Sequence, residues 1–128
     1  MRENLEELLE NSYAPYSKYN VSAICVMNDG KLIGGVNIEN ASYGATICAE
    51  RVAIFKAISM GYKKGDFKEL HIMVNSDKIG TPCFMCRQVF TEFFEKDMLV
   101  TCMNPDGETI VKTVSELCPY PFDSEDLK

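Results

Sequence analysis

Two short stretches, Cys48-Ala49-Glu50-Arg51 and Pro82-Cys83-Phe84-Met85-Cys86-Arg87-Gln88, organise the rest of the chain. Each stands at the start of a run that predicts a helix, and together they supply three cysteines and one carboxylate. Thiolates are good zinc ligands, whereas a nearby glutamate can move protons without binding the metal. Three protein ligands leave the fourth zinc position open for water, so the pattern indicates a catalytic rather than a structural metal site.

The place of these cysteines in their helices favours the ionised thiol. Pro82 suits the first position of a helix, so we expect Thr81 as its N-cap and helix over Met85–Phe94. A spacing of three residues puts Cys83 and Cys86 on the same side of that helix. Free N–H groups and the positive dipole end of a first turn lower thiol pKa values. Two helix starts can therefore direct three thiolates at one ion.

Apolar periodicity predicts the remaining elements. An amphipathic pattern predicts a helix over about residues 2–13, and the nearly all-apolar run Ile47–Met60 predicts a buried helix. We expect strands over Val21–Met27, Lys31–Ile38, Leu70–Val74, Met98–Met103 and Glu108–Val114, then a short helical turn at Ser115–Cys118. The pair Gly34–Gly35 weakens the second strand or marks a bulge. The strand, helix, strand order around the second cysteine helix implies a parallel pair, so we expect a three-layer α/β/α sandwich on a mixed five-stranded sheet.

Composition and charge restrict the classes of function. The 128 residues, 46% of them hydrophobic, suffice for one domain over residues 1–128 with a real core. No apolar run approaches the roughly 18 residues of a membrane span, and the start of the chain is acidic rather than signal-like, so we expect a cytoplasmic protein with no membrane partner. The net charge of −6 argues against a nucleic-acid partner, whose phosphates attract basic surfaces, and favours a free, uncharged small substrate.

Asn37 and Glu39 are candidates for the substrate-binding end of the site. They occupy alternate positions of an extended segment, so both side chains can point the same way. A carboxylate beside an amide suits sugar hydroxyls, which need acceptors and a donor, although the same pair would also suit a solvated strand end. Tyr19 closes an aromatic segment before the first strand, and its hydroxyl needs a partner if it is buried.

The motif C-x-E, followed at a distance by P-C-x-x-C, is the cysteine-only form of the zinc deaminase signature. With Ala14–Tyr19, Asn37–Tyr43 and Ser124–Leu127 in the same order, the chain resembles the small cytidine deaminases over most of its length. The resemblance implies Zn²⁺ as cofactor and hydrolysis of cytidine and deoxycytidine to uridine and deoxyuridine, with release of ammonia, in pyrimidine salvage. It further implies that zinc-held hydroxide attacks C4 while Glu50 carries the proton to N3 and later to the leaving amine.

The resemblance also assigns roles to individual residues. It implies that zinc is held by Cys48, Cys83 and Cys86, and that the pyrimidine nucleoside is bound by Tyr19, Asn37, Glu39 and Ala49. Tyr43 and Phe122 would reach the active sites of neighbouring subunits in a homotetramer. Gln88 would hold a ligand in place. Apart from the resemblance, Arg51, with Arg87 as a further candidate, lies beside the ligands in sequence, so a guanidinium hydrogen-bonded to a sulfur would offset the charge of the thiolates. The position of Arg51 would also suit a surface salt bridge.

Two departures from the family pattern bear on substrate choice. Phe84 stands where the family usually has glycine, and Tyr19 replaces the common phenylalanine, so pocket size or preference can differ. A deaminase of a related cytosine nucleoside such as blasticidin S therefore stays open.

Other readings of the cysteines are a closed structural zinc module, with Cys25, His71, Cys102 or Cys118 as fourth ligand, and a redox protein that uses Cys83 and Cys86. We interpret the four remaining candidates as ordinary strand or buried residues. Three disulfides would suit a secreted protein, but the size, the absence of a signal and the P-C-x-x-C context favour reduced thiols.

Overall fold

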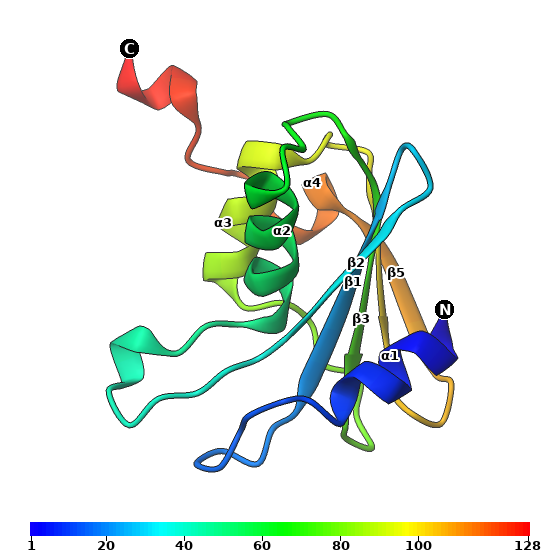
Figure 1. Cartoon of the computed structure of the whole chain (residues 1–128). Coiled ribbons are helices and arrows are strands. Elements are labelled where there is room, and N and C mark those ends of the chain that lie inside the picture. Colours follow the sequence, from blue (N-terminus) through cyan, green and yellow to red (C-terminus); the bar gives the residue numbers. More distant parts are fainter.

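A mixed five-stranded sheet is the centre of the computed structural model, which describes residues 1–128 (Figure 1). The strands lie in the order β2-β1-β3-β4-β5, where β3 and β4 are parallel and the other neighbours are antiparallel. Their bounds are β1 Val21–Met27, β2 Leu32–Val36, β3 Phe67–Val74, β4 Leu99–Met103 and β5 Thr109–Thr113. The parallel pair is the one that the order of strand, helix and strand predicts, because α3 crosses over between β3 and β4.

Helices cover both faces of the sheet, which confirms the three-layer prediction. α1 (Arg2–Leu9) packs Leu5 against Ile24 and Met73 on one face. On the other face lie α2 (Ala49–Ser59), α3 (Phe84–Phe93) and the short α4 (Val114–Leu117), which share the main core with the sheet. Short 3₁₀ turns are formed by Tyr43–Ala45 and Ser124–Leu127. In Figure 1 the second of these turns lies at the end of a tail that extends away from the sheet.

The glycine pair of β2 has a packing role and forms no bulge. Gly34 and Gly35 keep regular register with Ile24 and Ala23 of β1. A Cβ at Gly35 would lie 2.6 Å from the backbone nitrogen of Ala53, so its absence lets α2 approach the sheet closely. The only register shift between β1 and β3 lies elsewhere, at Val26–Met27.

The boundaries of α1 and β3 differ most from prediction. α1 ends at Leu9 rather than near residue 13, because the following residues turn toward the end of β2. There Tyr13 N–H donates to Asn37 O at 3.0 Å, and Glu39 N–H donates to Tyr13 O at 2.9 Å. β3 begins three residues early, at Phe67, whose ring packs 5.1 Å from that of Phe94. The first difference ties the N-terminal segment to Asn37 and Glu39.

The six cysteines are free thiols, so the three-disulfide alternative is not what the structure shows. None of the helices has the length and apolar character needed to cross a bilayer.

Candidate functional site

Three thiols from two helix starts meet beside the sheet. Cys48 is the N-cap of α2, Cys83 is the N-cap of α3, and Cys86 lies in the first turn of α3. Their sulfurs lie within 4.8 Å of one another, and Cys48 Sγ is 3.7 Å from Cys83 Sγ. A tetrahedral zinc with bonds of about 2.3 Å places its sulfur ligands about 3.8 Å apart. The cluster therefore fits one zinc ion.

The start of α3 differs from prediction by two residues. The N-cap is Cys83 rather than Thr81, because the sulfur of Cys83 accepts the Cys86 N–H at 3.4 Å. The Thr81 hydroxyl instead accepts a hydrogen bond from Arg87 Nη2 at 3.1 Å. Cys83 thus caps its own helix, which exposes its sulfur to the first-turn N–H groups.

Arg51 provides positive charge at the cluster. Its Nη2 donates to Cys48 Sγ at 3.4 Å, while its Nε is buried without a partner. A hydrogen bond from the Cys86 thiol, with a further one from Arg51, lowers the pKa of Cys48 to about 5 although burial opposes this. Because the Cys86 thiol is the donor to Cys48, its own pKa is raised. Of these two thiols, Cys48 is therefore the one that ionises more readily.

Glu50 is buried beside the cluster, with 5% of its surface exposed. It is the second residue of α2 and follows Cys48 by two positions. Burial, with a smaller contribution from the charge of Cys48, raises its pKa from 4.5 to about 7. A carboxyl group with a pKa near neutrality can both accept and donate a proton under ordinary conditions.

No fourth histidine, cysteine or carboxylate joins the three sulfurs. Cys25 and Cys102 are buried in β1 and β4, and Cys118 follows α4. His71 lies in β3, where its Nε2 is 3.6 Å from Glu69 Oε1. The closed structural module consequently lacks the ligand that it requires.

A cavity of about 420 Å³ opens from the cluster. One end is lined by Cys48, Cys83, Ala49 and Glu50, the other by Ser17, Asn37 and Glu39, and the wall between them includes Tyr19, Val74 and Gly80. The size suits a small organic ligand. The structure therefore brings most of the expected nucleoside-binding residues into the same cavity as the cysteines.

Asn37 is largely occupied by contacts within the protein. Its Oδ1 accepts hydrogen bonds from the Ser12 hydroxyl and, at 3.0 Å, from Val21 N–H. Its Nδ2 donates to Tyr19 O at 2.7 Å, so one amide N–H stays free for another partner.

Glu39 is held by the turn before β1. Its Oε1 accepts the N–H groups of Tyr16 and Ser17 at 3.0 and 3.1 Å, and its Oε2 accepts the Ser17 hydroxyl. These bonds, above all the one from the Ser17 hydroxyl, lower the pKa of Glu39, which is therefore ionised at neutral pH. Sequence reasoning did not find Ser17, because a serine in a turn is common and gives no sign of a partner 22 residues away.

Tyr19 places its hydroxyl over Gly80. A Cβ at position 80 would collide with that hydroxyl and lie 2.7 Å from Val74 Cγ2. Burial, followed by the negative charge of Glu50, raises the pKa of Tyr19. Gly80 thus leaves the space that the phenol occupies on the cavity wall.

The side chains of Gln88 and Arg87 form hydrogen bonds with groups other than the cysteine sulfurs. Gln88 Nε2 donates to Phe122 O and, at 3.4 Å, to Thr91 Oγ1. Arg87 donates to Pro82 O at 2.7 Å and to Leu117 O at 3.0 Å, which joins the start of α3 to α4. Gln88 therefore holds the C-terminal tail, and Arg87 holds the loop that carries Cys83.

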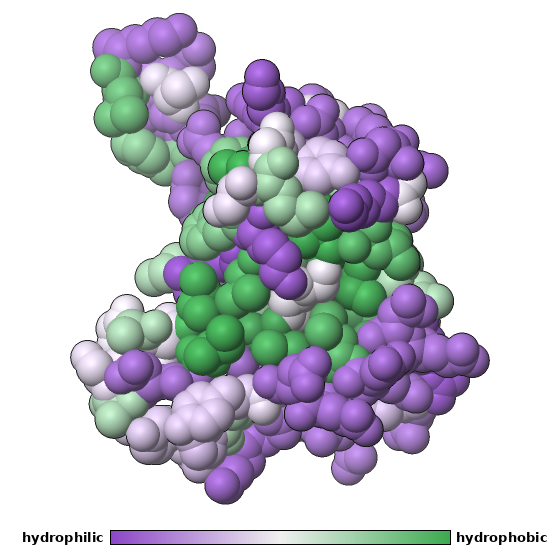
Figure 2. Space-filling view, viewed as in Figure 1, coloured by the Kyte–Doolittle hydropathy of each residue, from purple (hydrophilic) through white to green (hydrophobic).

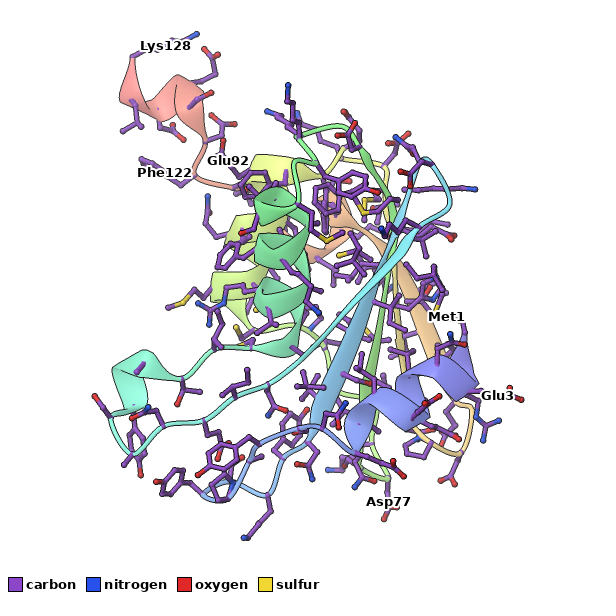
Figure 3. All side chains as sticks on the ribbon, in the orientation of Figure 1. Met1, Glu3, Asp77, Glu92, Phe122 and Lys128 are labelled. Carbon is purple, nitrogen blue, oxygen red and sulfur yellow. The ribbon has the colours of Figure 1, made fainter.

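Tyr43 and Phe122 lie outside the cavity. Tyr43 is 80% exposed on its 3₁₀ turn, and Phe122 is 58% exposed. Figure 3 shows Phe122 on the tail, beside the helix layer and away from the sheet. Phe84 is also exposed, with the Arg87 guanidinium 4.5 Å from the centre of its ring.

Comparisons with known proteins find cytidine deaminases and, at lower identity, a blasticidin-S deaminase. The family described as cytidine and deoxycytidylate deaminase zinc-binding region matches residues 1–102. A cytidine deaminase of Halalkalibacterium halodurans is 44% identical over 92% of this chain and 88% of that protein. The crystal structure of cytidine deaminase from Burkholderia pseudomallei is 39% identical, covers 94% of each chain and has a TM-score of 0.90. A blasticidin-S deaminase of Bacillus cereus is more distant, at 30% identity over 83% of this chain and 79% of that protein.

Proposed function

The chain belongs to the cytidine and deoxycytidylate deaminase family, and from this we propose that it hydrolyses the bond between C4 and the amino group of cytidine and deoxycytidine. It is a zinc-dependent enzyme, and the products are the uracil nucleoside and ammonia. The observation that carries the assignment is the cluster of three sulfurs at one end of a cavity with a buried carboxyl group beside it.

Cys48, Cys83 and Cys86 would hold the zinc, since their spacing fits a single tetrahedral ion and no fourth side chain competes. Bound zinc supplies Lewis acidity, which makes water a competent nucleophile near neutral pH. The two helix N-termini and the Arg51 guanidinium stabilise the anionic sulfurs. Arg51 also withdraws electron density from Cys48, which offsets the donation from three thiolates.

Glu50 would move the protons of the reaction. Its carboxyl group takes a proton from the attacking water and gives it to N3 of the pyrimidine, which makes C4 more electrophilic. A second transfer, to the exocyclic amine, lets ammonia leave. The pKa of about 7 supports this role, because the group must be ionised before the first step and protonated before the last.

Asn37 and Glu39 would bind the sugar at the other end of the cavity. Glu39 offers a carboxylate acceptor and Asn37 one free N–H donor. Ala49 and Tyr19 line the path between the two ends, so they would contact the base.

We further propose a homotetramer in which Tyr43 and Phe122 complete the sites of neighbouring subunits. Neither side chain reaches the cavity of its own chain, and both are exposed. Apolar surface also lies over α2 and β2, as Figure 2 shows, and Phe55 of α2 and Leu32 of β2 are exposed. Exposed apolar surface of this kind marks association. A monomer, verified by light scattering, with full activity would refute this proposal.

The test is ammonia release from cytidine by the purified protein, with zinc quantified on the same sample. We expect one zinc per chain and equal amounts of uridine and ammonia. Deoxycytidine, free cytosine and blasticidin S, assayed in parallel, establish the preference. Zinc-loaded protein that releases no ammonia from cytidine or deoxycytidine would overturn the proposed function.

A further inference from the structure

We infer that Ser17 is a positioning residue for substrate recognition, which holds the Glu39 carboxylate so that a single acceptor site is left for a sugar hydroxyl. The inference rests on the proposed function, because it concerns the sugar-binding end of the same cavity.

The first support is the occupancy of the carboxylate. An ionised carboxyl group has about four acceptor positions. Two positions on Glu39 Oε1 are taken by the N–H groups of Tyr16 and Ser17, and one on Oε2 is taken by the Ser17 hydroxyl. One acceptor position on Oε2 is left. Glu39 lines the cavity, so that position is available to a ligand there.

The second support is that the Ser17 hydroxyl joins both sides of the cavity. Besides donating to Glu39, its oxygen accepts Tyr19 N–H at 3.0 Å. Tyr19 forms part of the wall near Gly80, and its carbonyl oxygen accepts the Asn37 amide. Loss of this hydroxyl would therefore free Oε2 of Glu39, while Oε1 stays held by two backbone N–H groups, and would also loosen the backbone of Tyr19.

The third support is a strained residue at this turn. Lys18 has φ 61° and is the only non-glycine residue of the chain with positive φ. Its N–H donates to Ala14 O at 3.0 Å. Lys18 follows Tyr16 and Ser17, whose N–H groups donate to Glu39, and precedes Tyr19, whose N–H donates to the Ser17 hydroxyl. Strain of this kind persists where the surroundings fix it and is found at functional sites.

Asn37 and Glu39 together then present one free donor and one free acceptor. Two such groups can hold one hydroxyl, which donates to the carboxylate and accepts from the amide. They cannot hold both hydroxyls of a vicinal diol in this way, because the pair offers only one donor and one acceptor. We therefore expect the pair to recognise one ribose hydroxyl and to be indifferent to the other, so that one of two deoxy substrates is unaffected by changes at Ser17.

The experiment compares wild type, Ser17→Ala and Ser17→Thr, each zinc-loaded, on cytidine, 2′-deoxycytidine and 3′-deoxycytidine. Ser17→Ala should raise KM for cytidine by about 10-fold with kcat unchanged, the effect of weakening one hydrogen bond to a charged acceptor. Ser17→Thr, which keeps the hydroxyl, should restore most of the affinity. The increase in KM should disappear for the deoxy substrate that lacks the recognised hydroxyl.

Two controls separate positioning from general damage to the turn. Ser115→Ala removes a hydroxyl that bonds only to Thr113 and should match wild type. In a Glu39→Gln background, Ser17→Ala should add little, because the two residues act through one contact. Tm measurements on every variant identify any loss of folding.

Three results with Ser17→Ala would overturn the inference while wild-type activity stands. They are an equal loss of kcat/KM on all three substrates, a loss that falls on kcat, and a loss that Ser17→Thr does not restore. Wild-type protein inactive on every cytosine nucleoside would overturn the proposed function and the inference with it. The two failures are distinguishable because the second is visible before any variant is compared.

Discussion

The two ends of the cavity are built in different ways. At the cysteine end, the functional groups sit at helix N-caps and in first turns, and Ala49, Glu50 and Cys86 are buried in or beside the core. At the sugar end, Asn37 and Glu39 follow the end of β2 and are fixed by hydrogen bonds with the irregular segment between α1 and β1 and with the first residue of β1. The groups that we propose to react are thus held by packed secondary structure, whereas those that we propose to bind the sugar depend on contacts between loops.

This difference predicts what each end tolerates. Packed helices hold the sulfurs in place through many contacts, but a lost ligand cannot be replaced by a neighbour. Hydrogen bonds in a loop are individually weak, so changes there alter affinity before they alter the reaction. The predictions below test that division.

The largest effect is expected from a change at the cysteine end. Cys48→Ala removes one of three sulfurs, so we expect loss of zinc and a fall in activity on the order of 10³-fold or more, because several kcal/mol of charge stabilisation depend on the metal. Cys118→Ala is the matched control, since this thiol lies outside the cluster. Metal analysis and ammonia release on both variants provide the measurement. A Cys48→Ala protein that keeps stoichiometric zinc and turnover would contradict the ligand assignment.

Ionisation of the buried Glu50 carboxyl group should lower the free energy of unfolding of the zinc-free protein at neutral and higher pH. The pKa of Glu50 is raised in the folded state from 4.5 to about 7. The stability that this group contributes is present below pH 4.5 and is lost as the pH rises to about 7, because the unfolded carboxyl ionises first. Above pH 7 we expect Glu50→Gln to be more stable than wild type by about 3 kcal/mol, and below pH 4.5 to be equal to it.

Urea unfolding of both zinc-free proteins at pH 4 and pH 8 measures this difference. An advantage of Glu50→Gln that does not change with pH would show that the burial of charge is not its cause.

The smallest effect is expected on the wall between the two ends. Gly80→Ala places a methyl group against the Tyr19 hydroxyl and Val74, so we expect a loss of about 1–3 kcal/mol in stability from overpacking. Tyr19→Phe removes the hydroxyl and should recover part of that loss in the double variant. Thermal unfolding of the two single variants and the double variant tests the coupling. Strictly additive losses would mean that the hydroxyl does not occupy this space.

The sequence was sufficient to predict the cysteine end of the cavity, because the local spacing of the cysteines and the glutamate determines how they lie on their helices. A cysteine two residues before a glutamate, and two cysteines three apart after a proline, are positioned by the helix itself. The parallel pair of β3 and β4 also followed from the alternation of elements. The N-cap was misplaced at Thr81 because a sulfur that accepts its own helix N–H is an unusual cap.

The sugar end could be predicted only in part. Asn37 and Glu39 were identified, but Ser17 was not, because its contact with Glu39 joins segments whose local patterns are independent. The same limit explains Gln88, whose partner is the backbone of Phe122, 34 residues away. The end of α1 at Leu9 depends likewise on the distant pairing of Tyr13 with the end of β2. Tertiary contacts of this kind override local propensity.

The division between the two ends is tested most directly by kcat for cytidine of zinc-loaded Glu50→Gln, measured beside Glu39→Gln. We predict that Glu50→Gln keeps its zinc and loses about 10²–10⁴-fold in kcat, because the proton carrier is gone, while Glu39→Gln keeps kcat and raises KM. A zinc-loaded Glu50→Gln enzyme that turns over cytidine at the wild-type rate would contradict the account.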